Sequence, residues 1–206
     1  MTLLPAGPDA TLAAASIIKS GGVIAFKTDT FYGLGVDPFN TPAVERLKEI
    51  KLRDDGKPIL LLISDETELA RVSLETTLIF EKARRFFWPG PMTLVTRANP
   101  AVPLAITAGT GTIGIRLPGD LTVRELVRQC GGVLTATSAN VAGQPPAMNG
   151  GEVLDQFDQR IDLVVDGGEV TVTEPSTVLD ITAYPVRLIR EGAISRAAIE
   201  NVFEVE

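Results

Sequence analysis

Short apolar runs alternate with segments of helical periodicity along most of the chain. Continuous apolar or β-branched runs are typical of buried strands. They predict strands over residues 23–28, 58–63, 92–96, 112–117, 133–136, 162–166, 176–181 and 186–190. Helical spacing and start signals predict helices over 10–20 and 75–87, and others that begin near residues 41, 64, 120 and 195. Strands and helices that alternate through short connections indicate an α/β layered domain.

Residues with preferences for helix ends set the limits of several helices. Asp9 is expected to cap the first helix, which ends at Gly21 and Gly22. Thr41 is expected to cap the second helix, with a proline directly behind it in the first turn. Asp120 and Ser195 are expected to cap two later helices.

Some successive strands late in the chain have no helix between them, so the sheet is expected to mix parallel and antiparallel pairs. The 206 residues fit one domain, 1–206, better than two. We find no internal repeat and no low-complexity tract in the sequence. The longest irregular segment, 99–111, is a candidate functional loop.

Composition excludes several kinds of chemistry. The chain has no histidine, so it has no Ser-His-Asp triad, histidine base or histidine metal site. Its one cysteine, Cys130, can form neither an intrachain disulfide nor a thiolate zinc site. The net charge of −7 argues against a free-standing nucleic-acid binder but leaves room for a local basic cleft. Without a long apolar run or a secretory start, we expect no membrane span and a cytoplasmic location.

Four polar clusters stand next to predicted strand ends. They are "TDT" at 28–30 with Gly33 and Gly35 behind it, "KLRDDGK" at 51–57, "TAGTGTIGIR" at 107–116 and "TATSANVAGQPP" at 135–146. Ordinary interpretations exist: Lys51 and Arg53 suit a solvated loop, and Ser138 with Asn140 suits a turn. The sequence contains no P-loop motif. "GTGTIG" precedes a strand, so it is not the dinucleotide-binding fingerprint.

Arg116 stands apart because it interrupts the apolar strand pattern "TIGIRL". A half-buried arginine needs an anionic partner. That partner is either an internal carboxylate or a bound anion, and the sequence leaves both open. Arg190 raises the same question at the end of "VRLIR".

Taken in order, the clusters form a longer series: "KTDTFYGLG", "KLRDDGKPILLLI", "FWPGPMTLV", "TIGIRLP", "TSANVAGQPP", "PSTVLDI" and "VRLIREGAI". From about Ala10 to the end, this series resembles the YrdC-like threonylcarbamoyl-AMP synthase family in its single-domain form. The resemblance implies a twisted mixed sheet flanked by helices around a basic cavity. It implies synthesis of threonylcarbamoyl-AMP and pyrophosphate from L-threonine, bicarbonate or CO₂, and ATP with Mg²⁺. The product would feed threonylcarbamoyladenosine modification of tRNA beside the anticodon.

The resemblance also implies roles for individual residues. Lys51 and Arg53 would be catalytic, holding the triphosphate and the bicarbonate-derived carboxylate. The residues expected to contact threonine are Thr30, Arg116, Ser176 and, through its backbone, Ala136. Those expected to contact the nucleotide are Arg53, Lys57, Thr112, Ser138, Asn140, Pro146 and Arg190. In "TDTFYGLG", the glycines would turn the chain away from the ligand while Phe31 and Tyr32 pack beneath.

The sequence departs from the family pattern at three positions. Lys27 and Asp54 stand where relatives often carry proline, and Leu62 stands where some relatives place a threonine-contacting histidine. Two rival functions remain open: an RNA-binding module, and a carbamoyl-transfer domain like that of hydrogenase maturation factors. Pyrophosphate release that requires threonine and bicarbonate together would separate the enzyme from both. A tRNA threonylcarbamoyl-transfer complex is a candidate partner, with weak or no direct tRNA binding expected.

Overall fold

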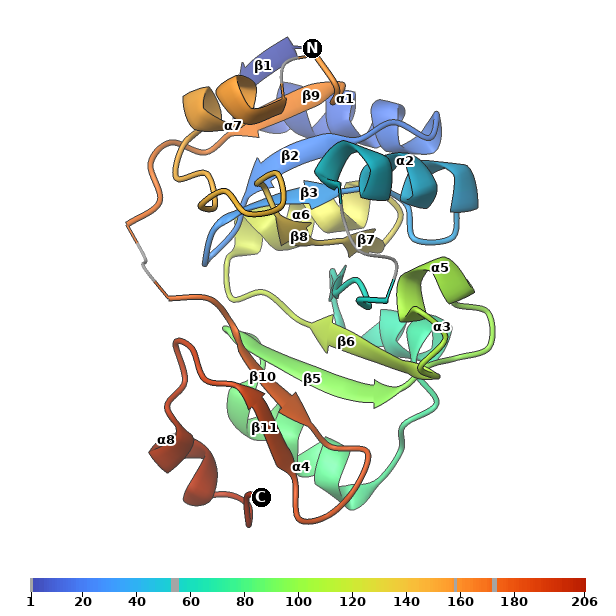
Figure 1. Ribbon diagram of the computed structural model, residues 1–206, viewed down its shortest axis with the longest axis vertical. Coiled ribbons are helices and arrows are strands. Elements are labelled where there is room, and N and C mark those ends of the chain that lie inside the picture. The colour runs from blue at the N-terminus through green and yellow to red at the C-terminus, as the bar shows by residue number, and fades with distance from the viewer. Residues whose placement is uncertain (1, 53–55, 158, 172–173) are drawn as a thin grey trace.

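The strands are divided between two mixed sheets that lie one above the other (Figure 1). This computed structural model describes residues 2–52, 56–157, 159–171 and 174–206. The first sheet has the order β1 (Thr2–Pro5), β9 (Leu163–Asp166), β2 (Ile24–Lys27), β3 (Tyr32–Gly35), β8 (Thr137–Ser138). The second has the order β11 (Arg187–Arg190), β10 (Thr177–Asp180), β5 (Met92–Arg97), β6 (Thr112–Arg116), β4 (Leu61–Ile63), β7 (Val133–Thr135).

Both sheets contain parallel and antiparallel pairs, which confirms the predicted mixed α/β class. The division into two sheets was not predicted, because an apolar run indicates a strand but not its neighbour. The chain passes from one sheet to the other at Ala136, between β7 and β8. There the backbone N–H of Thr135 donates to Val36 (3.1 Å) and that of Ala136 donates to Leu60 (2.8 Å).

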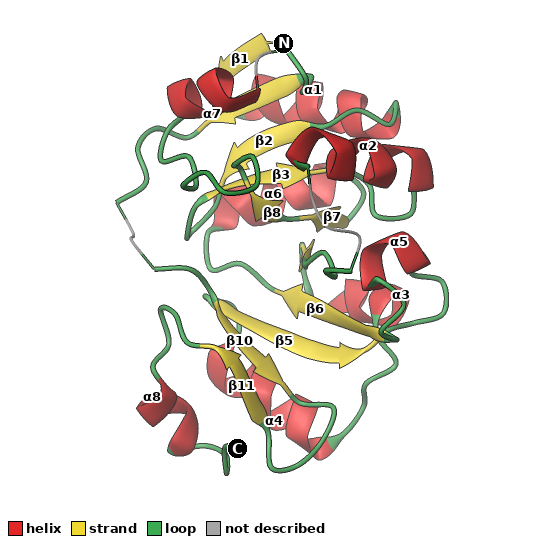
Figure 2. Cartoon of the chain, in the orientation of Figure 1, coloured by secondary structure: helices red, strands yellow, loops and turns green. Residues whose placement is uncertain are grey.

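Helices cover both faces of the first sheet and the back of the second (Figure 2). They are α1 (Pro8–Lys19), α2 (Thr41–Lys51), the 3₁₀ turn η1 (Glu66–Glu68), α3 (Leu69–Val72), α4 (Leu78–Phe87), α5 (Leu104–Thr107), α6 (Leu121–Gln129), α7 (Gly150–Phe157) and α8 (Arg196–Glu200). In this view α2 and α7 lie in front of the first sheet, and α1 and α6 lie behind it. No helix in the described ranges is long and apolar enough to cross a membrane.

Two of the predicted caps are confirmed and two are wrong. Asp120 and Ser195 cap α6 and α8 through their side-chain oxygens. Thr41 is the first residue of α2, and the side chain of Asn40 provides the cap. Asp9 lies inside the first turn of α1, where its negative charge still favours the helix dipole.

The two glycines of "TDTFYGLG" lie within strand β3 instead of forming a turn. The chain reverses earlier, where the backbone N–H of Thr28 donates to the carbonyl of Phe31 (3.2 Å). A Cβ atom on Gly35 would lie 2.8 Å from the ring of Phe26, so close packing requires this glycine. The expected turn at Gly33 and Gly35 is therefore wrong, because the residues that signal turns here serve strand packing.

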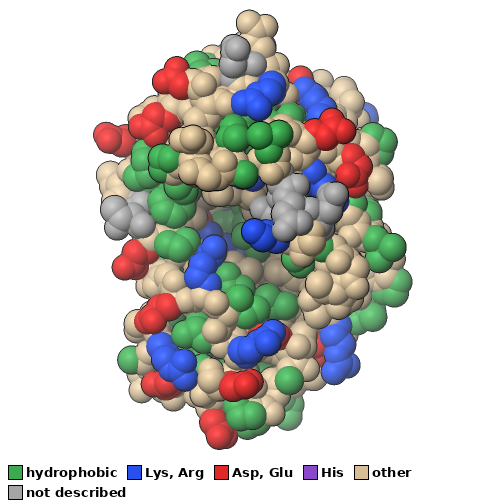
Figure 3. Space-filling view, in the orientation of Figure 1, with side chains coloured by type: hydrophobic (Ala, Val, Ile, Leu, Met, Phe, Trp, Pro, Cys, Tyr) green, Lys and Arg blue, Asp and Glu red, His purple; other side chains and the backbone are tan. Residues whose placement is uncertain are grey.

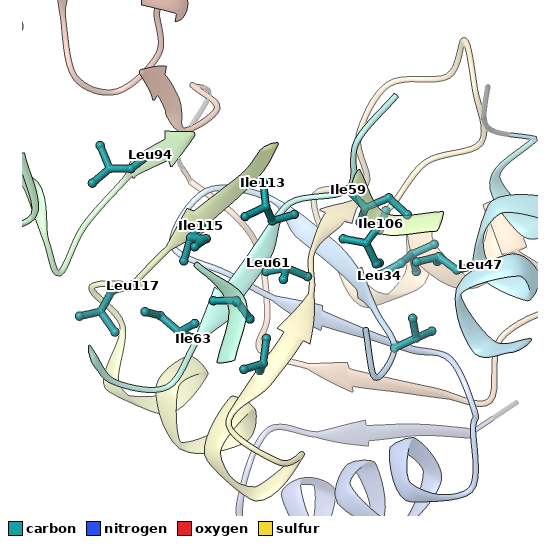
Figure 4. Packing of buried hydrophobic residues seen from close by; sticks show 14 of the residues in the cluster. Leu34, Leu47, Ile59, Leu61, Ile63, Leu94, Ile106, Ile113, Ile115 and Leu117 are labelled. Atoms are coloured by element: carbon teal, nitrogen blue, oxygen red, sulfur yellow. The ribbon is translucent and has the colours of Figure 1, made fainter. Parts of the chain in front are cut away.

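One hydrophobic cluster contains residues of both sheets. It includes Leu34 of β3, Leu61 of β4 and Ile115 of β6, and in Figure 4 Leu61 appears between Ile115 and Leu34. A second cluster joins α1 and α6 to the back of the first sheet through Ile24 and Phe26. The shared cluster fixes the two sheets against each other and so sets the shape of the space between them.

Candidate ligand-binding site between the sheets

A cavity of about 410 Å³ lies between the two sheets. One face of the second sheet forms its floor, with Leu62, Val95, Gly114 and Arg116 on neighbouring strands. The turn between β2 and β3 and the segment 136–138 close it from the first sheet. Figure 3 shows Lys and Arg side chains beside the hollow in the middle of this face. Within the described residues, no acidic side chain lines the cavity, in contrast to the net charge of −7.

All four predicted threonine-contacting residues and two of the seven predicted nucleotide-contacting residues meet at this cavity. Those that line it are Thr30, Arg116, Ala136, Ser138, Ser176 and Arg190. Those placed outside its lining are Lys51, Lys57, Thr112, Asn140 and Pro146. Arg53 lies outside the described residues. The cavity also has a lining residue for which sequence reasoning proposed only a packing role, the partly exposed Phe31.

Arg116 is 2% exposed and is held by three groups of the protein. Its Nε donates to the carbonyl of Gly90 (3.1 Å) and its Nη1 to Oγ1 of Thr30 (3.2 Å). Its Nη2 forms an ion pair with the carboxylate of Asp29. Of the two partners that the sequence allowed for Arg116, an internal carboxylate is therefore present in the protein. Arg116 also lines the cavity, so a bound anion can be its second partner. Sequence reasoning missed Asp29, although the acidic residue between two hydroxyls was visible.

Arg190 is the second guanidinium at the cavity. It donates to the carbonyl of Ser176 from Nε (3.1 Å) and Nη2 (2.8 Å), and to the hydroxyl of Ser176 (3.1 Å). Although the residue as a whole is exposed, desolvation lowers the pKa of Arg190, and the positive charge of Arg116 lowers that pKa further. Two guanidinium groups that repel each other in one cavity make it a site for anionic ligands.

Hydroxyl groups complete the polar lining. The hydroxyls of Thr93 and Ser176 lie 3.0 Å apart, and those of Thr28 and Thr30 lie 3.1 Å apart. Thr28 also donates to the carbonyl of Phe31 (2.6 Å), which fixes the turn between β2 and β3. Hydroxyls can both donate and accept, so they suit a ligand that carries an amine or hydroxyl beside its anionic groups.

Lys51 joins the two motifs predicted to act together, but its amine does not face the cavity. Lys51 is 4% exposed, and its Nζ contacts the carbonyl of Ser138 and, at 2.9 Å, the carbonyl of Asn140. The hydroxyl of Ser138 donates to Oδ1 of Asn140 (2.5 Å). The end of α2 and the loop behind β8 thus form one connected unit at the cavity edge.

The remaining predicted residues lie farther out. Thr112 occupies the same face of β6 as Gly114 and Arg116, because side chains two residues apart point the same way. Lys57 is exposed and Pro146 is partly exposed. In the described part of the chain, His, Cys, Asp and Glu side chains nowhere gather in a group of three that could hold a metal ion. The cavity lining, with arginines and no carboxylates, does not fit a metal held by the protein.

The site is thus a basic cavity between two mixed sheets, with a lining that suits small anionic ligands. The family model Sua5_yciO_yrdC, described as "Telomere recombination", matches residues 16–192. The chain belongs to this Sua5/YciO/YrdC family.

Relatives with names and structures agree with this membership. A threonylcarbamoyl-AMP synthase of Pyrococcus abyssi is 34% identical over 92% of this chain and 56% of its own length. One of Bacillus subtilis is 34% identical over 92% of this chain and 55% of its own length. The crystal structure of P. abyssi Sua5 complexed with L-threonine superposes with a TM-score of 0.93 at 31% identity, covering all of this chain and 62% of that one. The chain thus spans little more than half the length of these relatives.

Proposed function

We propose that this chain makes threonylcarbamoyl-AMP and pyrophosphate from L-threonine, bicarbonate or CO₂, and ATP, and is therefore a nucleotidyltransferase. The observation that carries the proposal is the pair Arg116 and Arg190 in one cavity without an acidic residue among its described lining. Threonine and ATP each bring an anionic group to such a cavity. The name of the P. abyssi relative and the threonine in its Sua5 complex support the same reaction.

In the proposed reaction, the amine of threonine adds to CO₂ and loses a proton, which gives an N-carboxylate; when bicarbonate is the source, the same product forms with loss of water. That carboxylate attacks the α-phosphorus of ATP in line, and pyrophosphate leaves. Arg116 would bind the threonine carboxylate through its guanidinium fork, with Thr30 and Ser176 beside it. Arg190 and Ser138 would bind the nucleotide. The chain has no histidine, so catalysis would come from orientation and charge neutralisation, which can supply roughly 7–11 kcal/mol.

Arg53 remains the proposed cation for the phosphates, and Lys51 would act by holding the loop that binds them, because its amine is bound by carbonyls of that loop. The contact between Lys51 and the carbonyls of Ser138 and Asn140 supports a shared nucleotide side for the two motifs. Lys57, Thr112 and Pro146 would then contact the nucleotide only at its outer end. Mg²⁺ would enter bound to the phosphates of ATP.

The product would serve threonylcarbamoyladenosine modification of tRNA next to the anticodon, in the cytoplasm. A separate transfer complex would use the adenylate, so direct tRNA binding by this chain would be weak or absent. The net charge of −7 supports this division of labour.

The test is pyrophosphate release by the purified chain, with threonine and bicarbonate each omitted in turn and the adenylate identified by mass spectrometry. We expect release only when ATP, threonine and bicarbonate are all present. The matched control is Arg187→Ala, because Arg187 is a strand arginine outside the cavity lining. Release that continues without threonine would contradict the proposed reaction.

A further inference from the structure

Asp29 pairs with Arg116 without lining the cavity itself. Its neighbours Thr28 and Thr30 line the cavity, but Asp29 does not. One oxygen of its carboxylate pairs with Nη2 of Arg116, and the other accepts the backbone N–H of Gly119 (3.3 Å). The side chains of the pair are 20% and 3% exposed, so water screens their attraction weakly.

The contacts of Arg116 fix the plane of its guanidinium group. Nε is bound by Gly90 and Nη1 by Thr30, while Asp29 holds the second terminal nitrogen. Arginine has five N–H groups, two of them on each terminal nitrogen. At least one N–H therefore remains on each terminal nitrogen for a ligand. A carboxylate can accept this pair in the parallel, two-bond arrangement that favours arginine over lysine.

The two arginines of the cavity also differ in charge environment. Arg116 has a carboxylate partner, which reduces the positive charge at that guanidinium. Within the described residues, Arg190 donates to the neutral oxygens of Ser176. An amino acid is a zwitterion with one carboxylate, so it suits Arg116, whose charge is reduced by Asp29. A phosphate group carries up to two charges and suits Arg190, whose contacts are to neutral oxygens.

We propose that Asp29 is a positioning residue that orients Arg116 toward the cavity and reduces the positive charge there, so that Arg116 takes a monoanionic carboxylate in preference to phosphate. This inference rests on the proposed function, because it takes the carboxylate to be that of the amino-acid substrate. Asp29 acts through Arg116 and does not touch the substrate.

The test is Asp29→Asn, measured for KM of threonine, KM of ATP, kcat, and inhibition by inorganic phosphate against threonine. Without the Asp29 carboxylate, the guanidinium of Arg116 should lose its fixed orientation. This should raise the threonine KM about tenfold, while the ATP KM changes less than about threefold. A neighbouring opposite charge shifts ionic equilibria by roughly one power of ten or more, so phosphate should compete with threonine about tenfold more strongly. A purely structural role would not strengthen phosphate binding.

The matched control is Asp180→Asn. Asp180 pairs with Arg187 (3.0 Å), accepts a backbone N–H and is 14% exposed at its side chain, yet it lies outside the cavity lining. This control should leave both KM values and phosphate inhibition unchanged. Asp29→Glu keeps the charge and shifts its position, so it should raise the threonine KM several-fold without strengthening phosphate inhibition. If Asp29→Asn does not fold, the threonine KM and the phosphate inhibition of Asp29→Glu decide whether Asp29 positions Arg116.

A threonine KM within about twofold of wild type in Asp29→Asn, or phosphate inhibition that weakens together with threonine binding, would overturn the assignment. Calorimetric titration of the wild-type chain with L-threonine distinguishes a wrong assignment of Asp29 from a wrong proposed reaction. If wild type binds threonine but releases no pyrophosphate, the reaction is wrong, and Asp29 is judged by the threonine Kd. If wild type binds no threonine, the Asp29 assignment falls as well.

Discussion

Replacing Arg116 with lysine should distinguish two contributions of Arg116 to threonine binding, its positive charge and the hydrogen-bonding geometry of its guanidinium. Lysine keeps one positive charge but cannot reproduce both the bond to Gly90 and the two-nitrogen fork. A hydrogen bond to a charged group contributes about 1.5–3 kcal/mol, so losing the ligand's second bond should raise the threonine KM roughly 10- to 100-fold. The ATP KM should change less than about threefold, because Arg190 is unchanged.

The same substitution should also lower stability, because Arg116 has partners within the protein. Losing the Gly90 bond costs about 1.5–3 kcal/mol, and a domain of this size loses about 2–4 °C of Tm per kcal/mol. We therefore expect a Tm lower by roughly 3–12 °C. The assay is steady-state pyrophosphate release at a temperature well below both Tm values, with Arg187→Lys as the surface control. A lower Tm with an unchanged threonine KM would show that Arg116 serves only the fold.

Three further predictions follow from other groups. Arg190→Ala should raise the ATP KM roughly tenfold or more while leaving the threonine KM within about threefold, as steady-state kinetics can show. Lys51→Met should make the loop over residues 138–146 more sensitive to limited proteolysis, because the carbonyl oxygens of Ser138 and Asn140 lose the ammonium group that binds them. Equal cleavage of wild type and variant would contradict a role of Lys51 in holding this loop. Burial raises the pKa of Cys130 to about 12. The thiol should therefore resist alkylation at pH 8 until the chain unfolds, and its contribution to stability should decline between about pH 8.5 and 12 because the unfolded state loses its proton first.

Local sequence patterns predicted the features that depend on interactions between residues close in the sequence. Asp120 and Ser195 cap helices as expected, because a cap involves residues only two or three positions apart. The apolar run around Leu61 and Ile63 became a strand, although only over residues 61–63 of the predicted 58–63. Arg116 was found because a charged residue inside an apolar strand needs a partner.

Other features depend on contacts between distant segments, and the sequence carries no local signal for them. Tyr32–Gly35 is a strand because it pairs with Ile24–Lys27 and with β8, and glycine in that strand is dictated by the ring of Phe26. The partner of Arg116 could not be chosen in advance among the acidic residues. Asp29 became that partner only because the fold brings the turn behind β2 into contact with the end of β6.

The charge of the chain must be considered at two scales. A net charge of −7 repels a long polyanion, which would contact a large area of the surface. A small anion inside the cavity responds mainly to nearby groups, because charges farther than about 8 Å through solvent are screened at physiological ionic strength. Within that range it meets Arg116 and Arg190, and Asp29 is the carboxylate paired with the first of them. An acidic protein can therefore carry a selective anion site, and the pairing of one carboxylate with one of the two arginines determines which anion each arginine prefers.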